Sequence, residues 1–219
     1  MDWSPLWISL KIALVSTAFT FIFGIIAARA VMCVKKMRFV IDGILSLPLV
    51  LPPTVTGFFL LLAFGKNSRM GAFLNSVGVD IIFTWQGAAI AAAVASFPIM
   101  YRTARGAFEQ VDSELIDAAR QMGCGRVQTF FWVWVPLSWP GIASGLTLSF
   151  ARALGEFGAT IMIAGNLPGK TRTMSIAVYT AMQSGDRETA FRWTAVILIL
   201  SLSVLVILNF ITQSRYRKD

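Results

Sequence analysis

The residues of this 219-residue chain whose types and spacing could do chemistry are four acids, Glu109, Asp112, Glu114 and Asp117, which fall within nine residues. The whole chain has only eleven acids, so the cluster marks one stretch as unusually polar. No histidine is present, which excludes the usual zinc sites, histidine triads and histidine general bases. Because a stretch this polar cannot lie in hydrocarbon, we interpret it as a loop or a surface helix between two membrane spans.

The polar stretch predicts a short helix. Asp112 or Ser113 can cap its N-terminus, the acids crowd the first turn where the helix dipole favours them, and Arg120 lies near its end. Gly123 and Gly125 then stop it. On periodicity alone, an ordinary amphipathic connector is the favoured interpretation.

The spacing of small and apolar residues points beyond a connector. The pattern runs through Asp117, Ala118, Ala119, Gly123, Val133, Val135 and Pro136. It resembles the E-A-A-x3-G-x9-I-x-L-P signature loop of permease subunits of ATP-binding cassette importers, with Asp, Val and Val in place of Glu, Ile and Leu. That resemblance implies that residues 109–136 are a cytoplasmic coupling loop whose helix rests in a groove of a separate ATPase. The docking residues that it implies are Glu114, Asp117, Ala118, Ala119 and Gly123.

The elements that must carry this loop belong to a membrane protein. Hydrophobic residues make up 56% of the chain and charged residues 14%, with a mean hydropathy of +0.70, far from the composition of soluble domains. We expect one all-α domain over residues 1–219. The net charge of +8 comes from basic residues that flank apolar segments, which favours membrane anchoring over nucleic-acid binding. Cys33 and Cys124 are expected to be reduced.

About five transmembrane helices are expected. Their ranges are about 8–34, 39–64, 86–104, 137–164 and 193–211. The basic residues Lys35, Lys36 and Arg38 follow the first span, and Arg217 and Lys218 follow the last. Because basic loops stay inside, the N-terminus is predicted outside the cell and the C-terminus in the cytoplasm.

Three prolines interrupt the second span. Pro48, Pro52 and Pro53 remove backbone donors and expose carbonyls that lipid cannot satisfy. This face, which includes Thr54, must therefore meet protein or water. A packing kink and a broken helix that lines a transport pathway are both open interpretations.

The fourth span carries a packing motif and a charged pair. Gly141 and Gly145 have the spacing of small residues in packed helices. Arg152 and Glu156 are expected to share one helix face and so to offset part of the cost of about 3 kcal/mol for each charge in a membrane. The pair is either structural or lines a pathway. The pathway-lining candidates are Pro48, Pro52, Pro53, Thr54, Arg152, Gly155, Glu156, Gly158 and Thr160.

Residues 150–160 closely resemble the same region of molybdate importer permeases and, more loosely, that of sulfate and thiosulfate permeases. Residues 47–53 and 168–173 also resemble the molybdate group. The resemblance implies the type I importer permease fold in a bacterial inner membrane. It also implies a homodimer with two cytoplasmic ATPases and an extracytoplasmic molybdate-binding protein. No cofactor and no bond chemistry are implied for this chain, since the ATPase binds ATP and magnesium.

Other functions stay open from the sequence. Within the importer class, the chain could instead be a sulfate, thiosulfate or tungstate permease, and outside it a passive channel or a non-transporting membrane scaffold. A scaffold has no reason to keep the spacing of the coupling loop, and a channel needs no ATPase. The Gly-Lys-Thr at residues 169–171 has the wrong spacing for a nucleotide-binding loop and follows no buried strand, so no ATP site is assigned.

Overall fold

The computed structural model describes the backbone of residues 2–34 and 36–216, and their side chains except at 208, 209 and 211–216. Every regular element in this part of the chain is a helix, as predicted. The elements are α1 (Ser4–Cys33), α2 (Arg38–Val50), α3 (Pro53–Phe64), α4 (Arg69–Ser76), α5 (Trp85–Glu109), α6 (Ser113–Gln121), α7 (Arg126–Thr129), the π-helix η1 (Phe130–Trp134), α8 (Val135–Leu154), α9 (Gly158–Ala164), α10 (Met174–Gln183) and α11 (Arg187–Tyr216).

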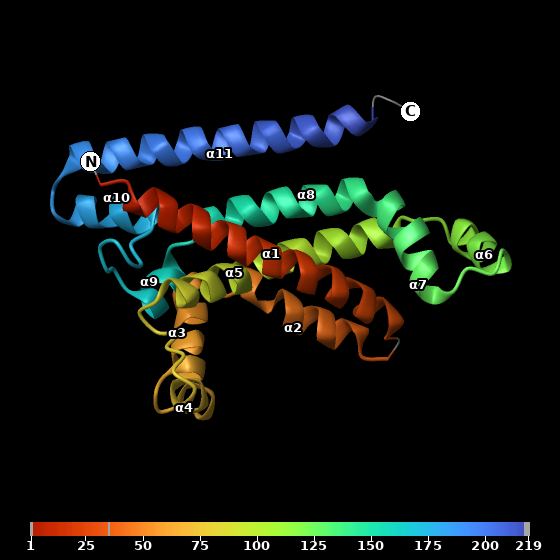
Figure 1. Cartoon of the computed structure of the whole chain (residues 1–219), viewed down its shortest axis with the longest axis horizontal. Coiled ribbons are helices and arrows are strands. Elements are labelled where there is room, and N and C mark those ends of the chain that lie inside the picture. The colour runs from red at the N-terminus through yellow and green to blue at the C-terminus, as the bar shows by residue number, and fades with distance from the viewer. Residues whose placement is uncertain (1, 35, 217–219) are drawn as a thin grey trace.

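The centre of the bundle is α5, which packs against α1 on one side and α8 on another. The long helices α1, α5, α8 and α11 extend along the molecule (Figure 1). The alanines of α5, among them Ala88, Ala91 and Ala92, are buried and let α1 approach closely. At Gly24 of α1 the approach is so close that a Cβ would lie 2.8 Å from the Cγ of Met100.

The contact between α5 and α8 depends on the two glycines that the sequence analysis assigned to packing. A Cβ on Gly141 would lie 2.5 Å from the Cβ of Ala107, and a Cβ on Gly145 would lie 3.0 Å from the Cβ of Thr103. Real Cβ atoms essentially never show the first distance, and the second is tighter than most real contacts. The predicted packing role of Gly141 and Gly145 is therefore confirmed.

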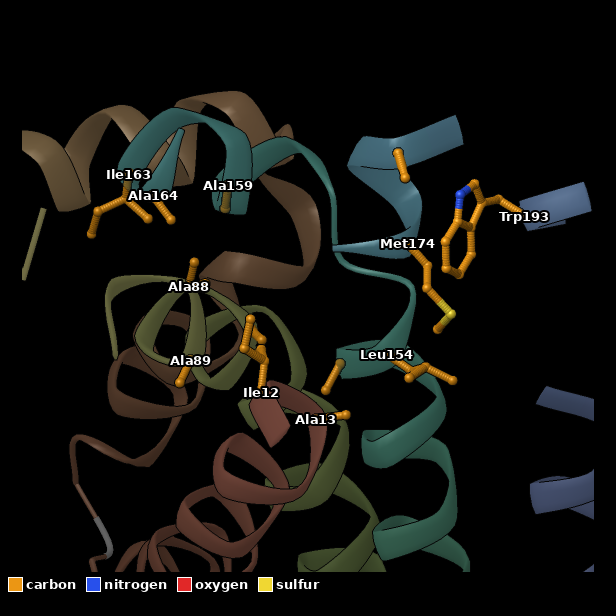
Figure 2. Packing of buried hydrophobic residues seen from close by; sticks show 14 residues of the cluster. Ile12, Ala13, Ala88, Ala89, Leu154, Ala159, Ile163, Ala164, Met174 and Trp193 are labelled. Carbon is orange, nitrogen blue, oxygen red and sulfur yellow. The ribbon is translucent and has the colours of Figure 1, made fainter. Parts of the chain in front are cut away.

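Two apolar clusters hold the bundle together. The first joins the start of α1 and α5 to α9, α10 and α11, and Figure 2 shows Ile12, Ala88, Ala159, Ile163 and Trp193 from it. The second lies at the other end of α5 and is aromatic; it contains Tyr101, Phe108, Trp134 and Ile142. The second cluster supports the segment from which α6 projects.

Two of the predicted spans are broken. Helices α2 and α3 meet at an angle of 111°, and the helical run that ends in α8 meets α9 at 56°. The first break falls at Leu51 and Pro52, where prolines made a broken helix one of two predicted outcomes. The predicted span over 137–164 is not one continuous helix, because α8 stops at Leu154 and α9 begins at Gly158.

The count of helices that could cross a membrane depends on how these breaks are treated. By length and composition, α1 and residues Arg187–Ile207 of α11 qualify as spans among the described residues, and four spans result if each bent pair counts as one. Helix α5 is not among them because it is rich in alanine and carries polar residues. Five crossings therefore remain a prediction.

Several boundaries differ from those expected. Helix α1 begins at Ser4, α5 continues to Glu109 and α11 begins at Arg187, each beyond the predicted apolar range. Helices α4 and α10 lie between the predicted spans. Of the basic residues used to orient the chain, Lys35, Arg217 and Lys218 lie outside the described residues.

Candidate functional site

The predicted coupling segment forms a helix that projects from one end of the molecule. Helix α6 lies at the end opposite the N-terminus (Figure 1). Asp112 caps it, since its Oδ1 accepts a hydrogen bond of 2.9 Å from the backbone N–H of Glu114. After the last turn, Gly123 adopts a φ of +86°, a left-handed conformation that favours glycine. Both helix ends that the sequence predicted are confirmed.

One face of α6 is attached to the bundle and the other is free. Ile116 is buried beside Phe108 and Trp134 in the aromatic cluster. The residues expected to dock lie on the accessible side: Glu114, Asp117, Ala118 and Gly123 are exposed and Ala119 is half-buried. Asp117 also pairs with Arg120 at 3.2 Å.

Two apolar residues of this segment were missed by the sequence analysis. Leu115 is 50% exposed and Met122 is 85% exposed, although each is large and apolar. Exposed apolar side chains amid acids are typical of a surface that another protein covers. Their spacing of seven residues, two helical turns, was the signal that could have identified them.

The segment that returns from α6 to the bundle is rigidly connected. Thr129 is buried at the end of α7, and η1 inserts one wide turn before α8. The ring of Trp134 in η1 packs beside Phe108 of α5, with ring centroids 5.7 Å apart. Arg29 of α1 lies over the same indole at 4.0 Å. The segment between α6 and α8 is therefore packed against both α5 and α1.

A buried carboxylate links the two helices on either side of the second break. Glu156 is 3% exposed, and its Oε2 lies 2.7 Å from an Nη of Arg152. Its other oxygen accepts a hydrogen bond of 2.8 Å from the backbone N–H of Ala159 in the first turn of α9. The expectation that Arg152 and Glu156 share one helix face is wrong, because Glu156 lies beyond the end of α8. The pair forms across the break.

The two breaks meet in space. A Cβ on Gly158, the first residue of α9, would lie 2.8 Å from the Cβ of Pro53, the first residue of α3. A Cβ on Gly57 would in turn lie 2.7 Å from the Cβ of Met162. The structure thus brings together the predicted residues Pro53 and Gly158, with Thr54 beside them.

The remaining pathway candidates differ in accessibility. Pro52, Thr54 and Gly155 are exposed, and Arg152 is partly so, with 33% of its side chain accessible. Thr160 is buried, and its hydroxyl has no hydrogen-bond partner among the described residues. Pro48 lies inside α2 and lines an apolar cavity between α1, α2 and α5, apart from the meeting point.

Comparison with known proteins shows which protein family the chain belongs to. Residues 20–218 match the family described as the binding-protein-dependent transport system inner membrane component. The chain belongs to this family. It is therefore a permease subunit of an ATP-binding cassette importer, which is not itself an enzyme, and family membership decides against the passive channel and the scaffold.

The relatives agree with this assignment. The permease is 41% identical over 215 residues to the molybdenum transport system permease protein ModB of Escherichia coli K12. The aligned residues cover 97% of this chain and 94% of that protein. It is 34% identical to the sulfate transport system permease protein CysT of Salmonella typhimurium, with coverage of 99% and 83%. The fold matches an inward-facing structure of the MetNI methionine transporter with a TM-score of 0.76, 17% identity and coverage of 96% and 94%.

The permease also has a polar cluster that the sequence analysis missed. Arg105 of α5 lies 2.5 Å from Asp42 of α2 and 2.9 Å from Glu109. The hydroxyl of Tyr101 donates a hydrogen bond of 2.7 Å to Asp42, and Arg38 pairs with Glu109. An acid inside a predicted span, four residues after Arg38, was the available signal. This cluster joins α2 to the end of α5 that leads into α6.

Within the residues that the structure describes, no three Cys, Asp or Glu side chains are grouped closely enough to hold a metal ion. The polar groups of the permease are paired charges, helix caps and exposed acids. They can position an anion or a protein partner.

Proposed function

We propose that this permease forms the membrane pathway for molybdate in an ATP-driven importer. The observation that carries the proposal is the 41% identity to a molybdenum permease over 97% of the chain. The arrangement of α6 supports it, since an exposed helix with acids and apolar residues is rigidly joined to two helices of the bundle. The closest competing substrate is sulfate, because a sulfate permease is 34% identical over a similar range.

The proposed assembly contains two copies of the permease, two cytoplasmic ATPases and an extracytoplasmic molybdate-binding protein. The ATPases bind ATP and magnesium, and this chain needs no cofactor. Five crossings place the N-terminus outside the cell and the C-terminus in the cytoplasm. In this proposal the start of α1 faces outside and α6 faces the cytoplasm, and Figure 1 shows these two elements at opposite ends of the molecule.

The proposed pathway passes the meeting point of the two breaks. Its lining includes the exposed residues of the first break, Pro52, Pro53 and Thr54, and the Arg152–Glu156 pair with Gly155, Gly158 and Thr160. A charge within a membrane marks a substrate path more often than a lipid-facing surface. Because Glu156 neutralises Arg152, this pair would not hold a passing anion tightly.

The proposed mechanism is alternating access. ATP binding draws the two ATPases together, and each carries the α6 docked on it through Asp117, Ala118, Ala119 and Gly123, with Glu114 beside them. The aromatic contacts of Trp134 and Phe108 pass this movement to α8 and α5. The bundle opens outward, and hydrolysis returns it to the inward-facing state.

Uptake of radiolabelled molybdate by cells that lack this permease tests the substrate. We expect uptake when the intact permease is restored, and a large molar excess of sulfate should reduce it only slightly. If restored cells take up sulfate and not molybdate, the chain is a sulfate permease.

Co-purification tests the docking surface. We expect the intact permease to retain its ATPase and a variant with residues 117–123 scrambled to lose it. The control is Glu188→Gln with Arg192→Gln, which removes an exposed ion pair on α11 far from α6. Equal retention by the scrambled variant would contradict the docking role of α6.

A further inference from the structure

A polar cavity lies between α5, α6 and α8 at the coupling end of the bundle. Its volume is about 620 Å³. Its lining includes Arg102, Thr103, Gly106 and Gln110 from α5 and Ser144 from α8. The walls therefore offer a guanidinium, an amide and hydroxyl groups to whatever enters, together with ample room for water.

The charge of Arg102 distinguishes this cavity from the rest of α5. Arg105, three residues further along the same helix, is neutralised by Asp42 and Glu109. None of the ion pairs among the described residues includes Arg102, and its side chain is exposed. An unpaired guanidinium presents several donors in a planar fork that fits two oxygens of an oxyanion.

One acid lines the same cavity. Asp112 lies where α6 begins, and its carboxylate is engaged in capping the backbone N–H of Glu114. Its negative charge opposes an anion on Arg102 and so limits how tightly the cavity holds it. A weakly held anion is what a release site requires.

One face of α8 leads from the cavity toward the second break. Ser144 lines the cavity, Leu148 is exposed one turn further, and Arg152 follows after one more turn. Residues four apart lie on one side of a helix, and eight residues span about 12 Å. This face of α8 thus leads from Arg152 at the break to Ser144, which lines the cavity together with Arg102 of α5.

We propose that the Arg102 cavity is a binding site for a tetrahedral divalent oxyanion on the inner half of the pathway. This inference rests on the proposed function for the direction of transport, since an imported anion would reach Arg102 after Arg152. The ligand chemistry is set by the cavity itself: one unpaired guanidinium, neighbouring hydroxyl and amide groups, and an acid at the mouth.

Cysteine labelling of the complete transporter tests the site without relying on transport. The background is Cys33→Ser with Cys124→Ser, and the reporter is Gly106→Cys, which lines the cavity and has open space for a Cβ. The matched control is Gly43→Cys on α2, where a Cβ also meets no other atom and which does not line the cavity. The probe is a small anionic methanethiosulfonate, used with molybdate, sulfate, inorganic phosphate or chloride at equal ionic strength.

We expect molybdate to slow labelling at Gly106→Cys by about tenfold, which corresponds to about 1.4 kcal/mol. Chloride should have little effect, and labelling at Gly43→Cys should not respond to either anion. Arg102→Gln should abolish the protection, and Arg102→Lys should keep part of it. Protection that persists in Arg102→Gln, equal protection at Gly43→Cys, or no protection by any oxyanion would overturn the proposal.

The arms of the experiment separate the possible sources of the oxyanion. Protection by sulfate or phosphate without protection by molybdate supports the site and contradicts molybdate as the substrate. The transporter is placed in nanodiscs of zwitterionic lipid and, separately, of anionic lipid. Slow labelling without added anion in the anionic nanodiscs alone would show that a lipid headgroup occupies the cavity, which would overturn its role in the pathway.

Discussion

The two broken spans of this permease reach a similar shape by different means. At the first break, Leu51 and Pro52 are extended, with ψ values of 139° and 137°, and the helices diverge by 111°. At the second, no proline lies between α8 and α9, and the bend is 56°. The first break is imposed by the covalent structure of proline, whereas the second depends on the contacts of Glu156.

The two breaks also differ in how deeply they are buried. Helix α2 contains no buried residue, and the prolines at its end are mostly accessible. Glu156 is buried and must be balanced by Arg152 and the N–H of Ala159. We therefore expect the proline break between α2 and α3 to persist when its side-chain contacts are lost. The break between α8 and α9 should depend on the contacts of the buried Glu156.

Glu156→Ala should have the largest effect. It leaves Arg152 without its counter-ion inside the membrane and removes the acceptor for Ala159, so the free energy of unfolding should fall by about 3–5 kcal/mol. Denaturant titration of the detergent-solubilised permease measures this change. Glu156→Gln keeps an oxygen that can accept the hydrogen bond from Ala159, so its free energy of unfolding should fall less than that of Glu156→Ala. Equal decreases in the two variants would assign the whole effect to the lost charge. A change in Glu156→Ala of under about 0.5 kcal/mol would show that the pair does not hold the break.

Gly158→Val should rank second, because it acts where the two breaks touch. A Cβ at this position would lie 2.8 Å from the Cβ of Pro53, so α3 and α9 must move apart. Overpacking of this kind lowers stability by about 1–3 kcal/mol. The same titration measures the loss, and Gly43→Val, in open space, is the matched control. Equal stability of the two variants would show that the breaks are not in tight contact.

Pro52→Ala should have a smaller effect. The exposed ring makes its contribution mainly by restricting the unfolded chain, so its removal should lower the free energy of unfolding by about 0.4–1 kcal/mol. A loss as large as that of Glu156→Ala would remove the contrast between the breaks. The melting temperature in detergent, compared between the two variants, provides this test.

Gly155→Ala should have the smallest effect. Gly155 lies at the second break, but its φ is −86° and the nearest atom to an added Cβ is the carbonyl oxygen of Ala151 at 3.7 Å. We expect a change within about 0.5 kcal/mol. A larger loss would mean that the chain at this break, and not only Glu156, is conformationally restricted.

The sequence was most informative where local chemistry decides structure. Asp112 caps α6 and Gly123 ends it, as a capping residue and a glycine in a polar stretch predict. Gly141 and Gly145 pack as their spacing predicts. Asp42 was missed because its partners, Tyr101 and Arg105, are about sixty residues away in the chain.

The sequence by itself determined that this is a helical membrane protein, where its polar helix begins and ends, and that prolines bend or break its second span, because composition, caps and prolines act over a few residues. Only the tertiary structure decided that the fourth span is also broken and that its break meets Pro53. It also decided that Arg105 is neutralised while Arg102 faces an open cavity. These outcomes depend on which distant side chains reach a charge, and a one-dimensional pattern does not contain those distances.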